Sequence, residues 1–466
     1  METMINPING CHVVAVPFPG RGHANPMINL CTLLIPSPKI STITLILTEE
    51  WLSLISHQLP VGSPKLRIRT IPNVLPSELT RGADLSGFYK AVYTKMEAPF
   101  EEVLLSIDSQ RLEPPVTCIV YDAFLSWVVG VGRRRNIPVA AFWTQAPSVF
   151  SVYYHFDLIA DRGHVPKDNL PIGKELEIID YLPGVLPTRL TDLPIPTTNV
   201  NIILEAFTLL TKAQSIIFTS FYELQPNVIK ALSSNLHMPI YTIGPSIPFL
   251  SLKPSPLKSI PTNEGGYMNW LNSQPETSVL YVSLGSFLST STDQMKELSL
   301  GLQASGARYL WIVRADQESS LKAECCEEKG FMVPWCDQLR VLCHRSIGGF
   351  LTHCGWNSTM ESIFAGVPML TFPLRSEQIH NSKIIVEDLG VGEKLKRVLV
   401  GLENVIGREE IAEMVKKFMD LNGKESKEMR RRAKELQEIC RKAIDTGGST
   451  NASVTDFVES ICHGTS

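Results

Sequence analysis

Short apolar runs rich in β-branched residues alternate with longer stretches of helical character along the first half of the chain. The runs that we expect to form strands are 12–18, 43–48, 66–71, 116–121, 139–143, 215–219 and 240–243. This rhythm is typical of βαβ units, in which parallel strands form a sheet that helices cover on both faces. It therefore predicts a doubly wound α/β domain.

The alternation stops at residues 244–261, which read GPSIPFLSLKPSPLKSIP. The five prolines in this stretch cannot donate backbone hydrogen bonds, so we expect a linker between domains. Beyond it the alternation resumes, which predicts a second doubly wound domain. Its expected strands are 279–283, 309–313, 331–333, 348–351 and 369–372, with a helix over 293–304.

We expect four consecutive parts in the chain. Residues 1–245 form an N-terminal Rossmann-like domain, 246–262 the linker and 263–445 a C-terminal Rossmann-like domain that ends in a long charged helix. Residues 446–466 form a last helix, which we expect to pack back on the N-terminal domain. Because open α/β sheets bind ligands at the carboxyl ends of their strands, the functional residues should face a cleft between the two domains.

The composition excludes several classes of protein. A formal net charge of -4 leaves no excess of Lys or Arg for a nucleic-acid backbone. No apolar run reaches the roughly 20 residues of a membrane-spanning helix, and the N-terminus lacks a signal-peptide pattern, so we expect a cytoplasmic protein. We also expect a monomer. The ten cysteines form no Cys-x-x-Cys pair, which indicates buried reduced thiols and no metal site.

A glycine-rich turn follows the first expected strand and leads into His23. Its Gly20 and Gly22 are spaced like the start of a dinucleotide fingerprint, but Asn25 stands where the third glycine belongs, which argues against a nicotinamide dehydrogenase. His23 itself suits a general base, because imidazole titrates near neutral pH and the turn leaves it uncrowded. The alternative is a histidine near a helix N-terminus without any chemistry.

Asp122 follows the expected strand 116–121 and would lie at the same sheet edge as His23. A carboxylate there could accept a hydrogen bond from one imidazole nitrogen and leave the other nitrogen free to take a proton from a hydroxyl. The alternative for Asp122 is an N-cap of the helix that follows.

The most specific motif of the chain spans residues 335–378. It resembles the signature of the plant secondary-product glycosyltransferases, which act in plant secondary metabolism. The N-terminal half is similar to that family at His23, Asp122 and the strand end 142–144. The matching residues of the signature are Trp335, Gln338, Leu342, His344, His353, Cys354, Gly355, Trp356, Asn357, Ser358, Glu361, Gly366, Val367, Pro368, Pro373, Glu377 and Gln378.

The resemblance implies the GT-B fold and a UDP-sugar donor site. An indole such as Trp335 offers a flat face for uracil, and Cys336 would contribute backbone groups. Gln338 and Glu361 resemble the residues that hold the ribose, because a carboxylate can accept hydrogen bonds from both ribose hydroxyls. The alternative is that each Trp and His is simply part of the core, which is implausible for so many matches together.

The diphosphate and the sugar have their own residues in this resemblance. His353, Gly355, Trp356, Asn357 and Ser358 lie at a strand end and a helix start, where side-chain donors, backbone N–H groups and the helix dipole would hold the diphosphate. A second glycine loop brings Ser286 to the same group. The sugar is implied to contact Glu377, Gln378 and Thr144, with Trp143 beside it.

A terminal Gln in the motif, here Gln378, accompanies glucose in the family, so the resemblance implies UDP-glucose as the donor. Asp337 and Arg375 depart from the family's usual residues and predict a more polar sugar edge. We expect no cofactor and no metal, because protein groups replace the cation at the departing diphosphate.

The implied reaction is direct displacement with inversion. His23, assisted by Asp122, would take the proton of the acceptor hydroxyl, and the product would be a β-glucoside. The acceptor is expected to be a small hydrophobic flavonoid, phenolic or terpenoid. Rival hypotheses are a nucleotide-sugar epimerase or hydrolase on the same fold, and a non-catalytic sensor of UDP-sugars. The expected acceptor pocket consists of Phe88, Tyr89, Phe124, Trp127 and the stretches 149–155 and 188–196.

Overall fold

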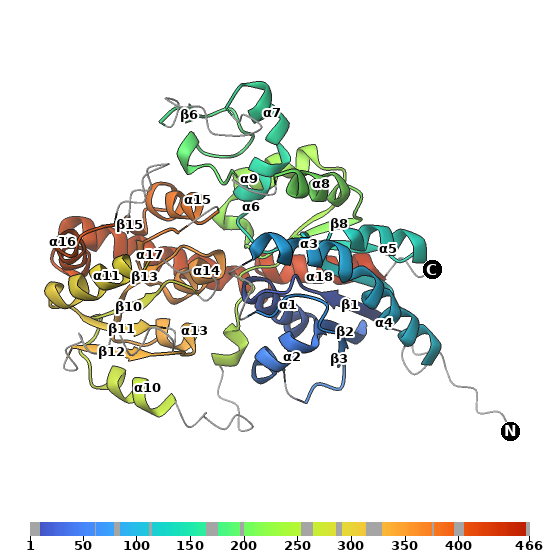
Figure 1. Ribbon diagram of the computed structural model, residues 1–466, viewed down its shortest axis with the longest axis horizontal. Helices are drawn as coiled ribbons and strands as arrows, with labels where there is room; N and C mark the ends of the chain where they lie inside the picture. Colours follow the sequence, from blue (N-terminus) through green and yellow to red (C-terminus); the bar gives the residue numbers. More distant parts are fainter. Residues whose placement is uncertain are drawn as a thin grey trace. The chain divides into compact units, whose positions relative to one another are not determined.

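The structure is a computed structural model that describes residues 10–60, 62–78, 84–110, 114–164, 176–195, 200–252, 264–285, 291–313, 329–374, 377–395 and 405–462 (Figure 1). The chain divides into two units. The first comprises residues 1–156, 196–246 and 443–466, and the second comprises 157–195 and 247–442. No helix in the described ranges is both long and apolar enough to cross a membrane.

The first unit is built on a seven-stranded sheet in the order β3-β2-β1-β4-β5-β8-β9, with parallel pairing throughout. All seven predicted strands are confirmed. They are β1 (Cys11–Val16), β2 (Ile40–Thr48), β3 (Leu66–Ile71), β4 (Cys118–Asp122), β5 (Val139–Trp143), β8 (Ser215–Phe218) and β9 (Ile240–Thr242).

Helices and short helical turns connect these strands. They are α1 (Arg21–Leu34), α2 (Glu49–Ile55), η1 (Ser56–Gln58), α3 (Leu85–Lys95), α4 (Glu97–Gln110), α5 (Trp127–Arg135), α6 (Pro147–Tyr154), α8 (Val200–Leu210), η3 (Tyr222–Leu224), α9 (Pro226–Asn235) and α18 (Ser449–Cys462). On β1, Val13 and Ala15 join the core that α1 and α18 cover, while Val14 and Val16 are equally buried toward the other face. A strand buried on both faces explains the continuous apolar runs of the sequence.

The second unit has a six-stranded sheet in the order β12-β11-β10-β13-β14-β15, again with parallel pairing. Its strands are β10 (Val279–Ser283), β11 (Arg308–Ile312), β12 (Gly330–Val333), β13 (Ile347–Thr352), β14 (Met369–Thr371) and β15 (Gly392–Lys394). The first five were predicted and are confirmed, whereas β15 was not predicted. The doubly wound fold class is thus confirmed for both units.

The helical segments of the second unit include the predicted helix 293–304. They are η4 (Phe249–Leu252), α10 (Glu264–Asn272), α11 (Thr292–Ser305), α13 (Gln338–Leu342), α14 (Trp356–Ala365), α15 (Glu377–Lys383), a π-helical turn η5 (Ile384–Asp388), α16 (Arg408–Met419) and α17 (Lys424–Ile444). The short helix α7 (Phe156–Asp161) begins at the division between the units.

The segment 157–195 is grouped with the second unit, although residues 1–245 were predicted to form one domain. It contains a small antiparallel pair, β6 (Ile178–Ile179) and β7 (Thr188–Arg189), and the turn η2 (Leu190–Asp192). Arg189 pairs with Glu387 of η5 at 2.7 Å, and the carbonyl of Asp192 accepts a hydrogen bond from Nδ1 of His380 at 3.1 Å. These polar contacts join the segment to α15 and η5, about 190 residues further along the chain.

The C-terminal helix α18 packs on the first unit. Phe457, Val458 and Ile461 join the core beneath β1 and β2, and the hydroxyl of Thr450 donates to the carbonyl of Gly244. This packing brings Cys462 to Cys11, where the two form a disulfide. The expectation of reduced thiols is therefore wrong for this pair, because a separation of 451 residues gives no sequence signal for it. The buried cysteines outside this disulfide are Cys31, Cys118, Cys336, Cys354 and Cys440.

Candidate functional site

His23 and Asp122 are brought together by the parallel pairing of β1 and β4. Val16 is in register with Tyr121, so the turn after β1 lies beside the end of β4. Nδ1 of His23 is 2.8 Å from Oδ2 of Asp122. The Asp122 side chain is fully buried, whereas 22% of the His23 side chain is exposed. The predicted pair is therefore present in the first unit, with its imidazole open to solvent and its carboxylate enclosed.

The carboxylate of Asp122 is held at both oxygens. Oδ1 accepts a hydrogen bond from the backbone N–H of Phe124 at 3.1 Å, while Oδ2 contacts His23. Since α5 begins at Trp127 with Ser126 at its N-cap, Asp122 does not cap that helix. Because a carboxylate only accepts hydrogen bonds, Nδ1 of His23 is the donor when it bonds to the carboxylate form of Asp122.

Thr144 is also in contact with His23. Its Oγ1 lies 3.0 Å from Nδ1 of the imidazole, and the residue is only 4% exposed. Thr144 directly follows β5, which pairs with β4 in the sheet. The sugar contact expected for Thr144 stays a prediction, and its contact with His23 is a feature that the sequence did not indicate.

Aromatic rings surround the imidazole. The ring centroids of Phe18 and Phe124 lie 5.0 and 5.9 Å from that of His23, and Phe88 and Tyr89 pack on Phe18 at 5.8 and 5.9 Å. Three of the four aromatic residues expected around the acceptor therefore gather near His23. The fourth does not join them, because it packs in the core: Trp127 lies 5.4 Å from Phe100 and is 8% exposed.

The two longer stretches expected to line the acceptor pocket stay a prediction. Val149 and Phe150 of the stretch 149–155 are fully buried in α6. Residues 188–195 are grouped with the second unit, and residue 196 lies outside the described residues. Tyr154 and His155, at the end of the first stretch, are partly exposed.

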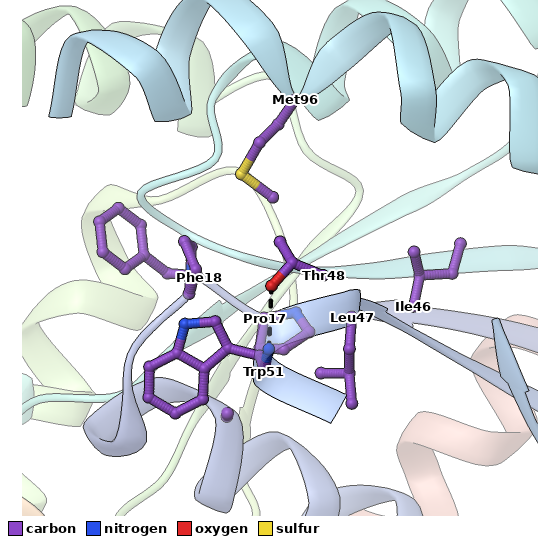
Figure 2. A pocket seen from close by; sticks show the side chains of 9 residues that line it. Pro17, Phe18, Ile46, Leu47, Thr48, Trp51 and Met96 are labelled. Carbon is purple, nitrogen blue, oxygen red and sulfur yellow. Dashed lines mark hydrogen bonds between the residues drawn. The ribbon is translucent and has the colours of Figure 1, made fainter. Parts of the chain in front are cut away.

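A small apolar cavity lies beside Phe18 at the carboxyl ends of β1 and β2 (Figure 2). In Figure 2, the rings of Phe18 and Trp51 and the thioether of Met96 surround it, and Oγ1 of Thr48 accepts from the backbone N–H of Trp51 at 3.2 Å. The sequence did not identify this cavity, because its residues come from three separate segments. Its lining is Pro17, Phe18, Pro19, Ala24, Ile46, Leu47, Thr48, Trp51 and Met96.

In the second unit, a hydrogen-bonded cluster joins three of the predicted donor residues. Nε2 of Gln338 donates to Oγ of Ser358 at 2.9 Å and to Oε2 of Glu361. Its Oε1 accepts from the hydroxyl of Tyr281 at 3.1 Å. Tyr281 was not predicted, since a tyrosine within a buried strand gives no sign of a polar role. The two ribose candidates, Gln338 and Glu361, thus lie within hydrogen-bonding distance of each other.

Burial raises the pKa of Glu361 to about 7, and the hydrogen bond from Gln338 offsets only part of this rise. A carboxylate that binds ribose hydroxyls would therefore gain or lose its proton in the neutral range. Cys336 beside it is 6% exposed, and burial raises the pKa of its thiol to about 12. The thiol stays protonated at neutral pH, as expected of a residue that contributes only backbone groups.

His353 follows β13 and lies against two glycines. A side chain at Gly285 or Gly355 would approach Nε2 of His353 to 2.6 or 2.5 Å, so both positions need the absence of a Cβ. Burial lowers the pKa of His353 to about 4, which keeps the ring neutral near pH 7. A neutral imidazole still offers one N–H to a phosphate oxygen.

The helix α14 begins at Trp356 after Gly355, and no side chain caps its first turn. The first N–H groups of a helix have no intrahelical partner, so this terminus can receive an anion. Asn357 is partly exposed in that turn, whereas Trp356 and Ser358 are buried at 4% and 8% exposure. The predicted diphosphate residues therefore do lie at one strand end and the following helix start.

The other predicted donor residues are placed as follows. Trp335 follows β12 with 48% of its surface exposed, which is unusual for an indole and compatible with the predicted stacking. Glu377 begins α15 and is partly exposed, while Gln378 is buried and its Oε1 accepts from the backbone N–H of Leu374 at 3.0 Å. Ser286 and Arg375 lie outside the described residues.

Asn381 is a further residue of this region that the sequence did not reveal. It is fully buried, and its Nδ2 donates to the carbonyl of Cys354 at 2.9 Å. Cys354 has a φ of 66°, a left-handed conformation that non-glycine residues rarely adopt. The amide of Asn381 thus holds the turn between His353 and α14. Among the described residues, no three His, Cys, Asp or Glu side chains are grouped so as to hold a metal ion.

Comparison with known proteins gives consistent relatives along the whole chain. Residues 255–408 match the family described as UDP-glucoronosyl and UDP-glucosyl transferase. The chain is 47% identical to UDP-glycosyltransferase 87A2 of Arabidopsis thaliana, over 97% of this chain and 96% of that protein. It is 34% identical to 7-deoxyloganetin glucosyltransferase of Catharanthus roseus, over 92% and 91% of the two chains.

Solved structures are similar over the same length. The crystal structure of UGT71G1 of Medicago truncatula, complexed with UDP-glucose, superposes with a TM-score of 0.81 at 26% identity and covers 98% of this chain and 99% of that one. The structure of TcCGT1 in complex with UDP gives a TM-score of 0.82 at 27% identity, with 97% and 99% covered.

Proposed function

Because this chain belongs to the plant family 1 UDP-glycosyltransferases, which have the GT-B fold and transfer a sugar from a UDP-sugar donor, we propose that the sugar is glucose and the acceptor a hydroxyl of a small hydrophobic molecule. The relatives support glucose, since one is named a glucosyltransferase and one structure holds UDP-glucose. Gln378 at the end of the signature supports the same donor. The aromatic cluster around His23 supports an apolar acceptor such as a flavonoid, phenolic or terpenoid.

The reaction is an inverting displacement with His23 as the base. Nε2 of His23 takes the proton of the acceptor hydroxyl as the oxygen attacks the anomeric carbon, and the bond to UDP breaks on the opposite side. Asp122 stabilises the imidazolium that forms. The single observation that carries this mechanism is the 2.8 Å contact between Nδ1 of a partly exposed His23 and a fully buried Asp122.

The donor is held by the second unit. The uracil stacks on Trp335, the ribose hydroxyls bind Glu361 and Gln338, and the diphosphate receives N–H groups from His353, Asn357 and the start of α14. These groups stabilise the negative charge of the departing UDP. The proposal includes neither a metal ion nor a cofactor. It leaves Glu377 and Gln378 to contact the sugar, and a cytoplasmic location and a monomer stay predictions.

The test is an assay of purified protein with a panel of phenolic, flavonoid and terpenoid acceptors. We expect UDP-glucose to give products one hexose heavier by mass spectrometry, and UDP-galactose to give much less. His23→Ala should lower the turnover by about 100-fold to 10,000-fold, the usual contribution of a general base. Asp122→Asn should also lower it, while both variants still bind UDP.

Three outcomes would contradict the proposal. Turnover of His23→Ala close to that of the unaltered protein would remove His23 as the base. A preference for another UDP-sugar would overturn the choice of glucose. Consumption of UDP-glucose without any acceptor product, across the whole panel, would indicate hydrolysis instead of transfer.

A further inference from the structure

The Nδ1 atom of His23 has two oxygen neighbours that come from the ends of two adjacent strands. Oδ2 of Asp122 lies at 2.8 Å and Oγ1 of Thr144 at 3.0 Å. We propose that Thr144 is a positioning residue for His23, which fixes the plane of the imidazole so that Nε2 points at the acceptor hydroxyl. This inference rests on the proposed role of His23 as the base.

The hydrogen-bonding capacities of the three groups are consistent with one N–H shared between two acceptors. With its proton on Nδ1, the imidazole donates, and both the carboxylate of Asp122 and the hydroxyl oxygen of Thr144 can accept from that one N–H in a bifurcated bond. Rotation of the ring about its Cβ–Cγ bond would lengthen at least one of these contacts. Two acceptors of one N–H therefore restrict the ring more than Asp122 alone.

The position of Thr144 is itself rigid. Its neighbour Trp143 is fully buried, donates from Nε1 to the carbonyl of Ala146 at 3.1 Å and stacks on Phe124 at 5.4 Å. Thr144 is only 4% exposed, at the end of a strand in the middle of the sheet. A short side chain on such a backbone has little freedom, which is what a residue that orients another group requires.

The carboxylate is fixed in a comparable way, because Oδ1 of Asp122 is occupied by the N–H of Phe124. The edge of Phe124 and the tilted ring of Phe18 then pack on His23. The imidazole is thus fixed by two hydrogen-bond acceptors and two aromatic rings. Since misalignment of a catalytic group lowers the rate steeply, loss of either acceptor should reduce turnover.

A role in positioning and a role in binding the sugar predict different kinetics. A residue that only binds the donor changes the KM for the UDP-sugar, whereas one that orients the base lowers kcat and leaves that KM unchanged. A residue that acts through His23 also has no further effect once His23 is removed, because the two then form one functional unit.

The test uses Thr144→Val, which keeps the shape and removes the acceptor oxygen, together with Thr144→Ser, which keeps the oxygen. We expect kcat of Thr144→Val to fall by about threefold to tenfold, the worth of one neutral hydrogen bond, with the KM for UDP-glucose unchanged within about twofold. Thr144→Ser should restore most of the loss. In a His23→Ala background, Thr144→Val should change the residual rate by less than about twofold.

Thr219 offers a matched control. It follows the neighbouring strand β8, is 1% exposed, and its Oγ1 is buried without a hydrogen-bond partner in the described part of the chain. Thr219→Val makes the same change at the same depth without touching His23, so its kcat should match that of the unaltered protein. Thr144→Ala serves as a second variant should Thr144→Val lower the melting temperature.

The inference is overturned when the Thr144 variants behave like Thr219→Val, when only the KM for UDP-glucose rises, or when Thr144→Val costs as much in the His23→Ala background as in the unaltered protein. The last two results would assign Thr144 to the sugar. A His23→Ala protein with full turnover is a separate outcome, since it contradicts the proposed base itself.

Discussion

Replacing Glu361 by glutamine should remove a pH dependence of stability that the fold imposes on this carboxyl. The ordinary pKa of the group is 4.5, and burial raises it to about 7 in the folded protein. Below pH 4.5 the carboxyl is protonated in both the folded and the unfolded protein, so its ionisation does not change the free energy of unfolding. Between these values the folded chain holds a proton that the unfolded chain has lost, so the free energy of unfolding falls as the pH rises.

The magnitude follows from the size of the pKa change. Each pKa unit corresponds to about 1.4 kcal/mol. A rise of the pKa from 4.5 to about 7 therefore lowers the free energy of unfolding above pH 7 by at most about 3 kcal/mol. The Glu361 side chain is not wholly excluded from solvent, so water screens part of this cost and we expect about 1 to 3 kcal/mol. The glutamine of Glu361→Gln cannot ionise, so this variant should not lose stability in this way as the pH rises.

The measurement is the melting temperature of both proteins without ligand between about pH 5 and pH 8. Relative to Glu361→Gln, the melting temperature of the unaltered protein should fall by about 1 to 2 °C per kcal/mol as the pH rises across this range. Glu102→Gln, an exposed carboxyl on α4, serves as the control and should follow the unaltered protein. Parallel curves for Glu361→Gln and the unaltered protein would refute the argument that burial sets this pKa.

Three further predictions concern other parts of the fold. Trp335→Ala should raise the KM for UDP-glucose by about tenfold or more in steady-state kinetics, because it removes a stacking face worth about 1 to 3 kcal/mol, and an unchanged KM would exclude stacking. Gly285→Ala should weaken UDP binding in calorimetry, since φ is 81° and the new Cβ would lie 2.6 Å from Nε2 of His353; equal affinity would show that the ring can move aside. Phe142→Ala should cost about 3 to 5 kcal/mol in urea unfolding, because Phe142 is fully buried in the sheet of the first unit, and a cost below about 1 kcal/mol would contradict its role in the core.

The strands could be predicted from the sequence because a buried parallel strand is recognisable locally. Residues 279–283, for example, carry apolar side chains toward both faces and form β10 as expected. The strand β15 was missed for the opposite reason: Gly392–Lys394 are only partly buried, and the sequence Gly-Glu-Lys has no strand preference. Its pairing with β14, and not its own residues, makes this segment a strand.

Contacts between charges far apart in the sequence accompany the grouping of residues 157–195 with the second unit. Arg189 and Asp192 meet Glu387 and Lys394, and no local pattern identifies which charges pair. From the sequence alone, each of these four residues would be predicted to be a charge on the solvated surface. The same limit applies to the disulfide between Cys11 and Cys462, which follows from the packing of α18.

The candidate site was predictable to the extent that sheet topology determines it. Once β1 and β4 are taken as parallel neighbours, the residues after them must meet, so the pairing of His23 with Asp122 follows from the pattern of strands. The pairing of β5 with β4 extends this reasoning one strand further and brings Thr144 to the same imidazole. Which atom of Thr144 faces the ring depends on its rotamer and on the buried Trp143 beside it. The order of the strands therefore predicts which residues lie close together but not which way their side chains point. For Thr144, that direction decides whether it acts on the base or on the sugar.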